Sequence, residues 1–151
     1  MNKEYIEKIS NTGKVIAPTI LRIGLALVFL WFGVNQIVNP TAWVAYIPDW
    51  VVSLSSLSAE TIVYLNAAFE IFFGVALFLG FFTRFVSFFL MLHIFEITYT
   101  VGFDATGVRD FGLSVAALVV FLNGADFFTL DRFMKEESSS KIEDGKAGGL
   151  I

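Results

Sequence analysis

The 151-residue sequence has no cysteine, a single histidine and only three prolines. Without cysteine the chain forms no disulfide, no thiolate metal site, no iron–sulfur cluster and no redox-active CxxC pair. Charged residues make up only 16% of the chain and the formal net charge is −4, which is not the basic surface of a nucleic-acid-binding protein. One histidine argues against a bis-histidine haem site, and we identify no metal site in the sequence.

Apolar residues are abundant instead. They form 56% of the chain, 18 of them are phenylalanine, and the mean hydropathy is +0.74. So many large apolar side chains on a water-facing surface would cause aggregation. The composition therefore predicts an integral membrane protein whose solvent is the lipid bilayer.

Four apolar runs have the length of a membrane span. About 20 helical residues cross a hydrocarbon core of roughly 30 Å, and the runs cover about 19–38, 61–82, 84–101 and 111–128. Pro18 is expected in the first turn of the first helix, where its missing N–H costs little. Short connections join the second run to the third (GFFTR) and the third to the fourth (GFDATGVRD). The sequence predicts an all-α fold, an antiparallel four-helix bundle in the membrane.

The polar segments divide the chain into three parts. Residues 1–17 form a cytoplasmic N-terminal segment with a weakly amphipathic helix, and 18–134 form the four-helix transmembrane domain. Residues 135–151, rich in Ser, Gly and charge, are expected to be a disordered cytoplasmic tail. The stretch at 42–58, between the first two spans, has the aromatic residues of a short element lying in the outer interface.

Lysine and arginine set the orientation. With both termini inside, nine of the ten basic residues lie at the cytoplasmic side and only Arg109 lies outside. We therefore expect a multi-pass protein of the cell membrane with cytoplasmic termini.

Three ionisable residues interrupt the apolar runs near the expected middle of the bilayer. Glu70 and His93 each lie nine residues from a predicted span end, roughly 14 Å deep, and Glu96 shares a helix face with His93. A charge at that depth costs about 2.5–3.5 kcal/mol, so such residues usually face the bundle interior and have a role. Glu70, His93 and Glu96 are our catalytic candidates, handling protons or facing a quinone. The alternative is that they only hydrogen-bond across helices.

Other polar residues form candidate binding layers. Asn66 shares the face of Glu70, and layers are expected at both ends of the bundle. The inner layer holds Arg22, Arg84, Asn123 and Asp126; the outer holds Asn35, Gln36, Arg109 and Asp110. Binding candidates are Arg22, Asn66, Arg84, Arg109 and Asp110. We expect Arg22 or Arg84 to meet Asp126 or Asp131, with a small gain of about 1 kcal/mol because the arginine could reach water.

Three segments resemble the DoxX family of membrane proteins. They are LRIGLALVFLWFGVNQIVNP, FEIFFGVALFLGFFTRF and RDFGLSVAALVVFLNGADFFTLDRF, and the resemblance extends over about 16–133. Gln36 stands where the family commonly has Lys, Asp126 where it has Gly, and Thr129 where it has Ser. The resemblance implies four membrane helices. Some members are linked to quinone-dependent sulfur oxidation or to quinol oxidase complexes.

The resemblance and the buried Glu and His suggest a membrane subunit of a quinone-linked redox system. A quinone or quinol headgroup would enter among Phe side chains, and a soluble or membrane redox partner protein would exchange the electrons. The chain itself offers no cofactor site that we identify, and assembly of several copies is open. Whether the protein is an enzyme also stays open. The alternatives are a non-catalytic assembly or scaffold protein, and translocation of protons or small solutes, which needs a continuous polar path.

Overall fold

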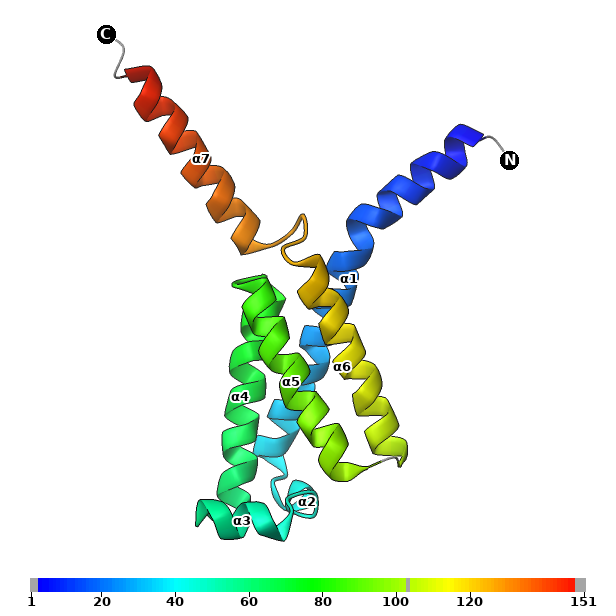
Figure 1. Cartoon of the computed structure of the whole chain (residues 1–151), viewed down its shortest axis with the longest axis vertical. Helices are drawn as coiled ribbons and strands as arrows, with labels where there is room; N and C mark the ends of the chain where they lie inside the picture. Colours follow the sequence, from blue (N-terminus) through cyan, green and yellow to red (C-terminus); the bar gives the residue numbers. More distant parts are fainter. Residues whose placement is uncertain (1–2, 103, 149–151) are drawn as a thin grey trace.

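The computed structural model describes residues 3–102 and 104–148, with only the backbone described for 4–6 and 140–148. This part of the chain is helical and contains no strand. Four helices are long and apolar enough to cross a membrane: α1 (Lys3–Val38), α4 (Ala59–Leu79), α5 (Thr83–Val101) and α6 (Ala105–Asn123). They run alternately up and down, and both ends of the chain lie beyond the same end of the bundle (Figure 1). The predicted all-α membrane bundle is confirmed.

Helix α1 begins much earlier than predicted. It runs without a break from Lys3, so Pro18 lies inside the helix and not in its first turn. A proline there removes the hydrogen bond to the carbonyl four residues earlier, at Lys14, which is exposed. In Figure 1 the N-terminal part of α1 leans away from the bundle. The predicted N-terminal helix is thus an extension of the first span.

A tight connection joins α4 to α5. Gly80 ends α4 with φ +68, a conformation that favours glycine, and its N–H bonds the carbonyls of Ala76 and Leu77. The Asp131 carboxylate then accepts hydrogen bonds from the N–H groups of Phe82 and Thr83, both at 2.7 Å. Asp131 thus caps the start of α5 from a distant part of the sequence.

Helix α6 is displaced from the predicted fourth span, 111–128. Asp104 caps it by accepting from the N–H of Gly107 at 2.8 Å, and α6 ends at Asn123. The GVRD residues that we expected in a turn therefore belong to the first two turns of α6. Polar residues are acceptable there because a helix start lies near the bilayer surface. Arg109 and Asp110 are consequently held on a rigid element.

The segment between α1 and α4 forms two short helices, α2 (Thr41–Val44) and α3 (Asp49–Ser55). Neither contains a buried residue. They lie at the end of the bundle away from the termini (Figure 1), which we call the distal end. The predicted short element is therefore two helices.

The C-terminal segment differs from the prediction of disorder at 135–151. Helix α7 runs over Leu130–Gly148 and projects from the bundle (Figure 1); residues 149–151 lie outside the described part. An Arg132–Glu136 pair at 2.9 Å, spaced i and i+4, supports its first turns. The polar composition excludes α7 from the apolar core without preventing helix formation.

The four long helices pack as two close pairs, α1 with α4 and α5 with α6, which touch each other less. At Gly33 of α1 a β-carbon would stand 3.0 Å from the carbonyl oxygen of Ala67, so only glycine permits this close approach to α4. Between the pairs lies an apolar core that includes Phe29, Leu77 and Leu90. Many other large apolar residues stay exposed, as a lipid-facing surface requires.

Candidate functional site

Buried and half-buried polar residues gather in two places inside the apolar bundle. One, in the distal half, consists of Gln36, Asn66, Glu70 and His93, and we call it the Glu70 cluster. The other, at the end nearer the termini, is centred on Arg22 and Asp126, and we call it the Arg22 clasp.

The Glu70 carboxylate is buried, with 2% of the residue exposed, and accepts hydrogen bonds from two amides. Gln36 Nε2 donates to Oε2 at 2.9 Å, and Asn66 Nδ2 donates to Oε1 at 3.2 Å. Asn66 Nδ2 also donates to Gln36 Oε1 at 2.9 Å, which closes a triangle between α1 and α4. The predicted association of Asn66 with Glu70 is therefore found.

His93 of α5 completes the cluster from the other helix pair. Its Nε2 lies 3.6 Å from Glu70 Oε1, which is too long for a hydrogen bond, and this buried nitrogen has no hydrogen-bond partner among the described residues. The ring packs against Phe69, with centroids 4.6 Å apart. Glu70 and His93 are thus brought together as their expected depth predicts.

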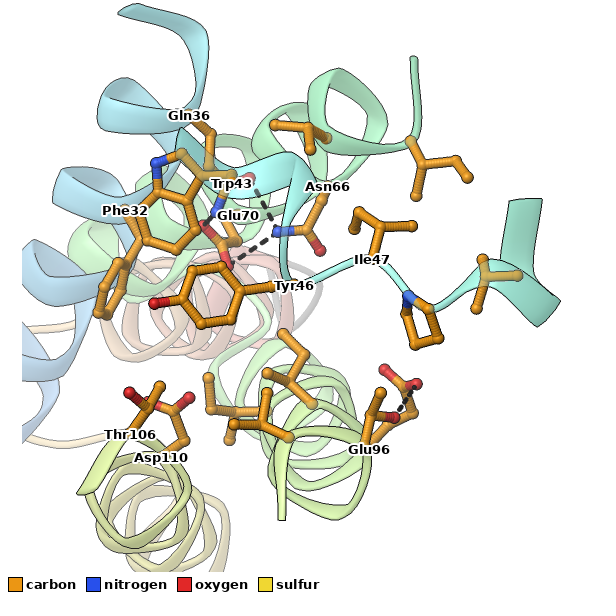
Figure 2. Close-up of a pocket in the computed structure, with 18 of the residues that line it drawn as sticks. Phe32, Gln36, Trp43, Tyr46, Ile47, Asn66, Glu70, Glu96, Thr106 and Asp110 are labelled. Atoms are coloured by element: carbon orange, nitrogen blue, oxygen red, sulfur yellow. Dashed lines mark hydrogen bonds between the residues drawn. The ribbon is translucent and has the colours of Figure 1, made fainter. Parts of the chain in front are cut away.

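Glu96 does not join them. It is exposed, and Thr100 Oγ1 donates to its Oε1 at 3.2 Å within α5. Spacing by three residues placed Glu96 near the face of His93, but His93 points inward to Glu70 while Glu96 lies toward the outside of the bundle. Figure 2 shows Glu96 well apart from Glu70.

Glu70 lines a cavity of about 350 Å³ in the distal half of the molecule (Figure 2). The α2 and α3 region covers it, and α1, α4, α5 and α6 form its walls. Phe32, Trp43 and Tyr46 provide an aromatic wall, and the polar lining includes Gln36, Asn66, Glu70, Glu96, Thr106, Arg109 and Asp110. Phe32 is the one described phenylalanine in the lining, so the expected Phe-lined entry is not what surrounds this cavity.

Two binding candidates meet on α6. Asp110 is buried, with 3% of its side chain exposed, and Arg109 Nε donates to its Oδ1 at 2.7 Å. The Arg109 guanidinium also lies over the ring of Phe32, 4.9 Å from the ring centre. α6 thereby contributes one carboxylate and one cation to the cavity.

The side chain of Trp43 attaches α2, which covers the cavity, to α1. Trp43 of α2 donates from Nε1 to Asn35 Oδ1 at 2.9 Å and packs edge-on against Phe32, with centroids 5.7 Å apart. Sequence reasoning placed Trp43 and Tyr46 only in an aromatic belt. Their clustering next to a polar helix end was the available signal for a site, but interfacial aromatics give the same pattern.

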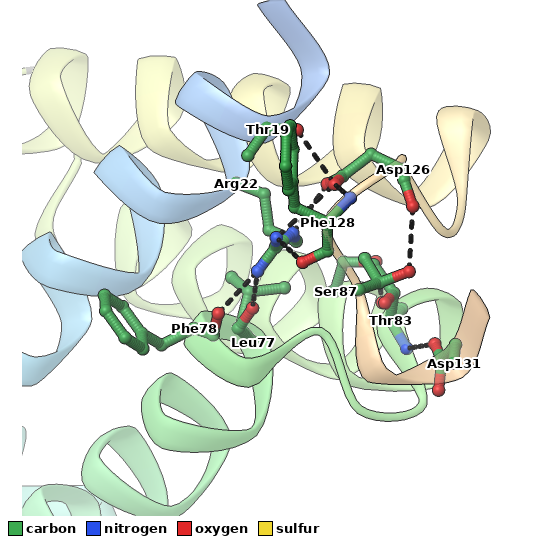
Figure 3. Close-up of polar contacts among 10 residues, drawn as sticks. Thr19, Arg22, Leu77, Phe78, Thr83, Ser87, Asp126, Phe128 and Asp131 are labelled. Atoms are coloured by element: carbon green, nitrogen blue, oxygen red, sulfur yellow. Dashed lines mark hydrogen bonds and ion pairs between the residues drawn. The ribbon is translucent and has the colours of Figure 1, made fainter. Parts of the chain in front are cut away.

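In the Arg22 clasp, all three nitrogens of a buried guanidinium donate hydrogen bonds (Figure 3). Arg22 is 1% exposed and its Nε donates to Asp126 Oδ2 at 2.6 Å. Its terminal nitrogens donate to three backbone carbonyls, those of Leu77, Phe78 and Phe128. Of the predicted pairings of Arg22 or Arg84 with Asp126 or Asp131, the structure has Arg22 with Asp126. The expectation that the arginine reaches water is wrong, because the chain after α6 folds over it.

Asp126 has further donors, from Thr19 Oγ1 and from the Phe128 N–H, both at 2.9 Å. Burial raises the pKa of the Asp126 carboxyl, but the hydrogen bonds from Arg22, Phe128 and Thr19, with the charge of Arg22, outweigh burial and hold the pKa below 3.8. Arg84 stays outside the clasp: it is exposed, and its side chain lies against Gly124. Asn123 is exposed as well.

Sequence reasoning assigned Gln36 to a separate outer layer and missed its place in the Glu70 cluster. Gln36 lies two residues before the end of α1, whereas Glu70 lies in the middle of α4. The two helices are therefore staggered, and α2 and α3 lie where α4 extends beyond α1. Counting residues from predicted span ends cannot show such a stagger.

Among the residues that the structure describes, no group of three His, Cys, Asp or Glu could hold a metal ion. No curated protein and no solved structure matches the chain. The family model for DoxX matches residues 17–102, a shorter span than the resemblance we saw to 133. These residues include α4, α5, most of α1 and the whole Glu70 cluster, more than half of the chain, and the protein therefore belongs to the DoxX family.

Proposed function

We propose that this DoxX-family membrane protein is a subunit of a quinone-linked redox system, and that the distal cavity holds a quinone or quinol headgroup. The observation that carries the proposal is that the buried Glu70 carboxylate both lines a 350 Å³ cavity and stands 3.6 Å from His93 Nε2, which has no hydrogen-bond partner among the described residues. A proton-exchanging pair beside a cavity is what quinone chemistry requires.

The cavity supports a small aromatic ligand. Its volume is within the range of small-molecule sites, which is about 300–1,000 Å³. Phe32, Trp43 and Tyr46 offer ring faces against which a flat headgroup can stack. The polar residues around them offer directed hydrogen bonds to its oxygens.

Glu70 and His93 are two neighbouring side chains that can each carry a proton. Interconversion of quinone and quinol moves two electrons and two protons, and the electrons would be exchanged with a redox centre of a partner protein. A proton on Glu70 Oε1 needs only a small movement to reach His93 Nε2, because the two atoms are 3.6 Å apart. The amides of Gln36 and Asn66 fix the carboxylate orientation.

One observation favours the scaffold alternative. The hydrogen bonds from Gln36 and Asn66 to Glu70 also hold α1 against α4, so the cluster could serve helix pairing alone. In that case the cavity would bind no headgroup. Ligand retention therefore separates the two functions.

Translocation has less support. On every long helix the buried residues between the Glu70 cluster and the Arg22 clasp include apolar core residues, such as Phe29, Leu77, Leu90 and Ala117. A proton or polar solute would need a continuous polar path, and this apolar core separates the two polar clusters.

The test is purification of the full chain in mild detergent, followed by lipid extraction and measurement of quinone per protein. We expect a near-stoichiometric amount, which falls strongly in Glu70→Leu. Glu60→Gln is the matched control, because Glu60 is an exposed carboxylate of α4 outside the cavity. Quinone no more abundant than in the bulk lipid extract would contradict the proposal and leave the scaffold role ahead.

A further inference from the structure

Some of the hydrogen-bond donors around the cavity are used by the protein itself. Both amide hydrogens of Asn66 are donated, to Gln36 and Glu70, and the Trp43 Nε1 hydrogen goes to Asn35. Thr100 donates to Glu96. Among the described residues, the hydroxyls of Tyr46 and Thr106 and the terminal nitrogens of Arg109 donate to no other residue, so free donors remain beside these.

Carboxylate acceptors are also left without donors. Asp110 receives Arg109 on Oδ1, while Oδ2 has no hydrogen bond from any described residue although the side chain is 97% buried, as its 3% exposure means. Glu70 uses two of about four lone-pair directions on its two amide donors. Figure 2 shows Tyr46 projecting between the Glu70 cluster and Asp110, with both carboxylates at the cavity.

The cation in the cavity lining is a side chain of the protein, Arg109. Of the lining residues, three are carboxylates (Glu70, Glu96 and Asp110) and one is a guanidinium, Arg109. Arg109 occupies the face of Phe32 and one oxygen of Asp110, which is where a cationic ligand would bind. The free donors and the free carboxylate oxygens together suit a neutral ligand with hydroxyl groups, because a hydroxyl both accepts and donates, whereas a carbonyl only accepts.

We propose that the cavity selects the reduced, hydroxyl-bearing form of the ring ligand over the oxidised, carbonyl-bearing form, and that Asp110 is a specificity-determining residue that accepts from one hydroxyl while Glu70 accepts from another. The inference rests on the proposed function, since it assigns the redox state that the same site prefers. A carbonyl oxygen facing Asp110 Oδ2 would meet a second acceptor with no hydrogen between them, whereas a hydroxyl donates to it.

The experiment compares a short-chain alkyl benzohydroquinone with its benzoquinone, under anaerobic conditions, by equilibrium dialysis against the detergent-solubilised full chain. We expect the hydroquinone to bind at least about tenfold more tightly, as one charge-assisted hydrogen bond can provide. Asp110→Asn adds a donor at the same place, so its preference should fall to about equal binding. Glu60→Gln, the exposed control, should keep the tenfold difference.

The outcomes separate this inference from the proposed function. Equal or tighter binding of the benzoquinone to the unaltered chain, or a folded Asp110→Asn that keeps the full preference, overturns the inference and leaves quinone binding standing. Binding of neither form overturns the proposed function as well. If Asp110→Asn does not fold, the ratio for the unaltered chain and the reduced ratio expected for Glu70→Gln still decide.

Discussion

Arg22 and Glu70 are buried to nearly the same degree, at 1% and 2% exposure, yet their surroundings differ. Arg22 donates to a carboxylate and to three backbone carbonyls. Glu70 is held by two amides, but it faces a cavity and a histidine nitrogen that forms no hydrogen bond with any residue in the described part of the chain. Saturated polar groups fix a structure, whereas partly free groups beside a cavity are available for binding and proton exchange.

The largest effect is expected when the saturated cluster is broken. Arg22→Met leaves the Asp126 carboxylate buried without its cation, and the carbonyls of Phe78 and Phe128 without their donor. Removing one partner of a buried pair costs about 3–5 kcal/mol, so we expect the free energy of unfolding in detergent to fall by that amount. Arg84→Met, at an exposed arginine, should change it by less than about 0.5 kcal/mol. Equal effects of the two would show that the clasp is not a stabilising element.

Acid should weaken the same clasp, to a lesser extent because the carbonyl bonds of Arg22 survive. The pKa of Asp126 is below 3.8 in the folded protein and about 3.8 in the unfolded chain, so its contribution is complete above pH 3.8 and is lost as the pH falls through the lower value. The melting temperature of the unaltered protein should therefore approach that of Asp126→Asn below pH 3.8. A constant gap between the two proteins down to pH 2 would contradict this account.

The presence of four membrane helices could be predicted, because apolar runs of about 20 residues follow directly from the solubility of residues in lipid and water. The start of α6 could not, since Arg109 and Asp110 have the composition of a turn and only Asp104 marks the cap. Helix α7 was missed for the opposite reason: its composition is typical of disorder, and its turns are supported by local pairs such as Arg132 with Glu136.

The two polar clusters were predictable to different extents. Depth and charge sign narrowed the inner pair to Arg22 or Arg84 with Asp126 or Asp131, and they placed Glu70 and His93 at the same depth. The complete burial of Arg22 depends on how the chain after α6 folds back, and the contact of Gln36 with Glu70 depends on the stagger of α1 against α4. Both are tertiary features with no local signal.

A glycine beside the clasp gives the third test. A β-carbon at Gly80 would stand 2.6 Å from Thr129 Cγ2, and the φ of +68 is unfavourable for other residues. Gly80→Ala should lower the free energy of unfolding by about 1–3 kcal/mol. Gly112→Ala in α6, where nothing lies within 4 Å, should raise it by about 0.5–1 kcal/mol. Chemical denaturation in detergent measures both, and a neutral Gly80→Ala would mean that the connection adapts.

The smallest effect on stability, and the largest on ligand retention, is expected at Glu70. Glu70→Gln keeps an acceptor for one amide and should lower the free energy of unfolding by less than about 1 kcal/mol, whereas Glu70→Leu leaves the amides of Gln36 and Asn66 without theirs and should cost about 1–2 kcal/mol. If Glu70 handles protons, Glu70→Gln should nonetheless reduce quinone retention or turnover as much as Glu70→Leu does. Thermal unfolding and quinone content, measured on the same preparations, separate the two contributions. Retention and turnover that stay unaltered in Glu70→Gln but fall together with stability in Glu70→Leu would make the Glu70 cluster, like the Arg22 clasp, a device for holding helices together.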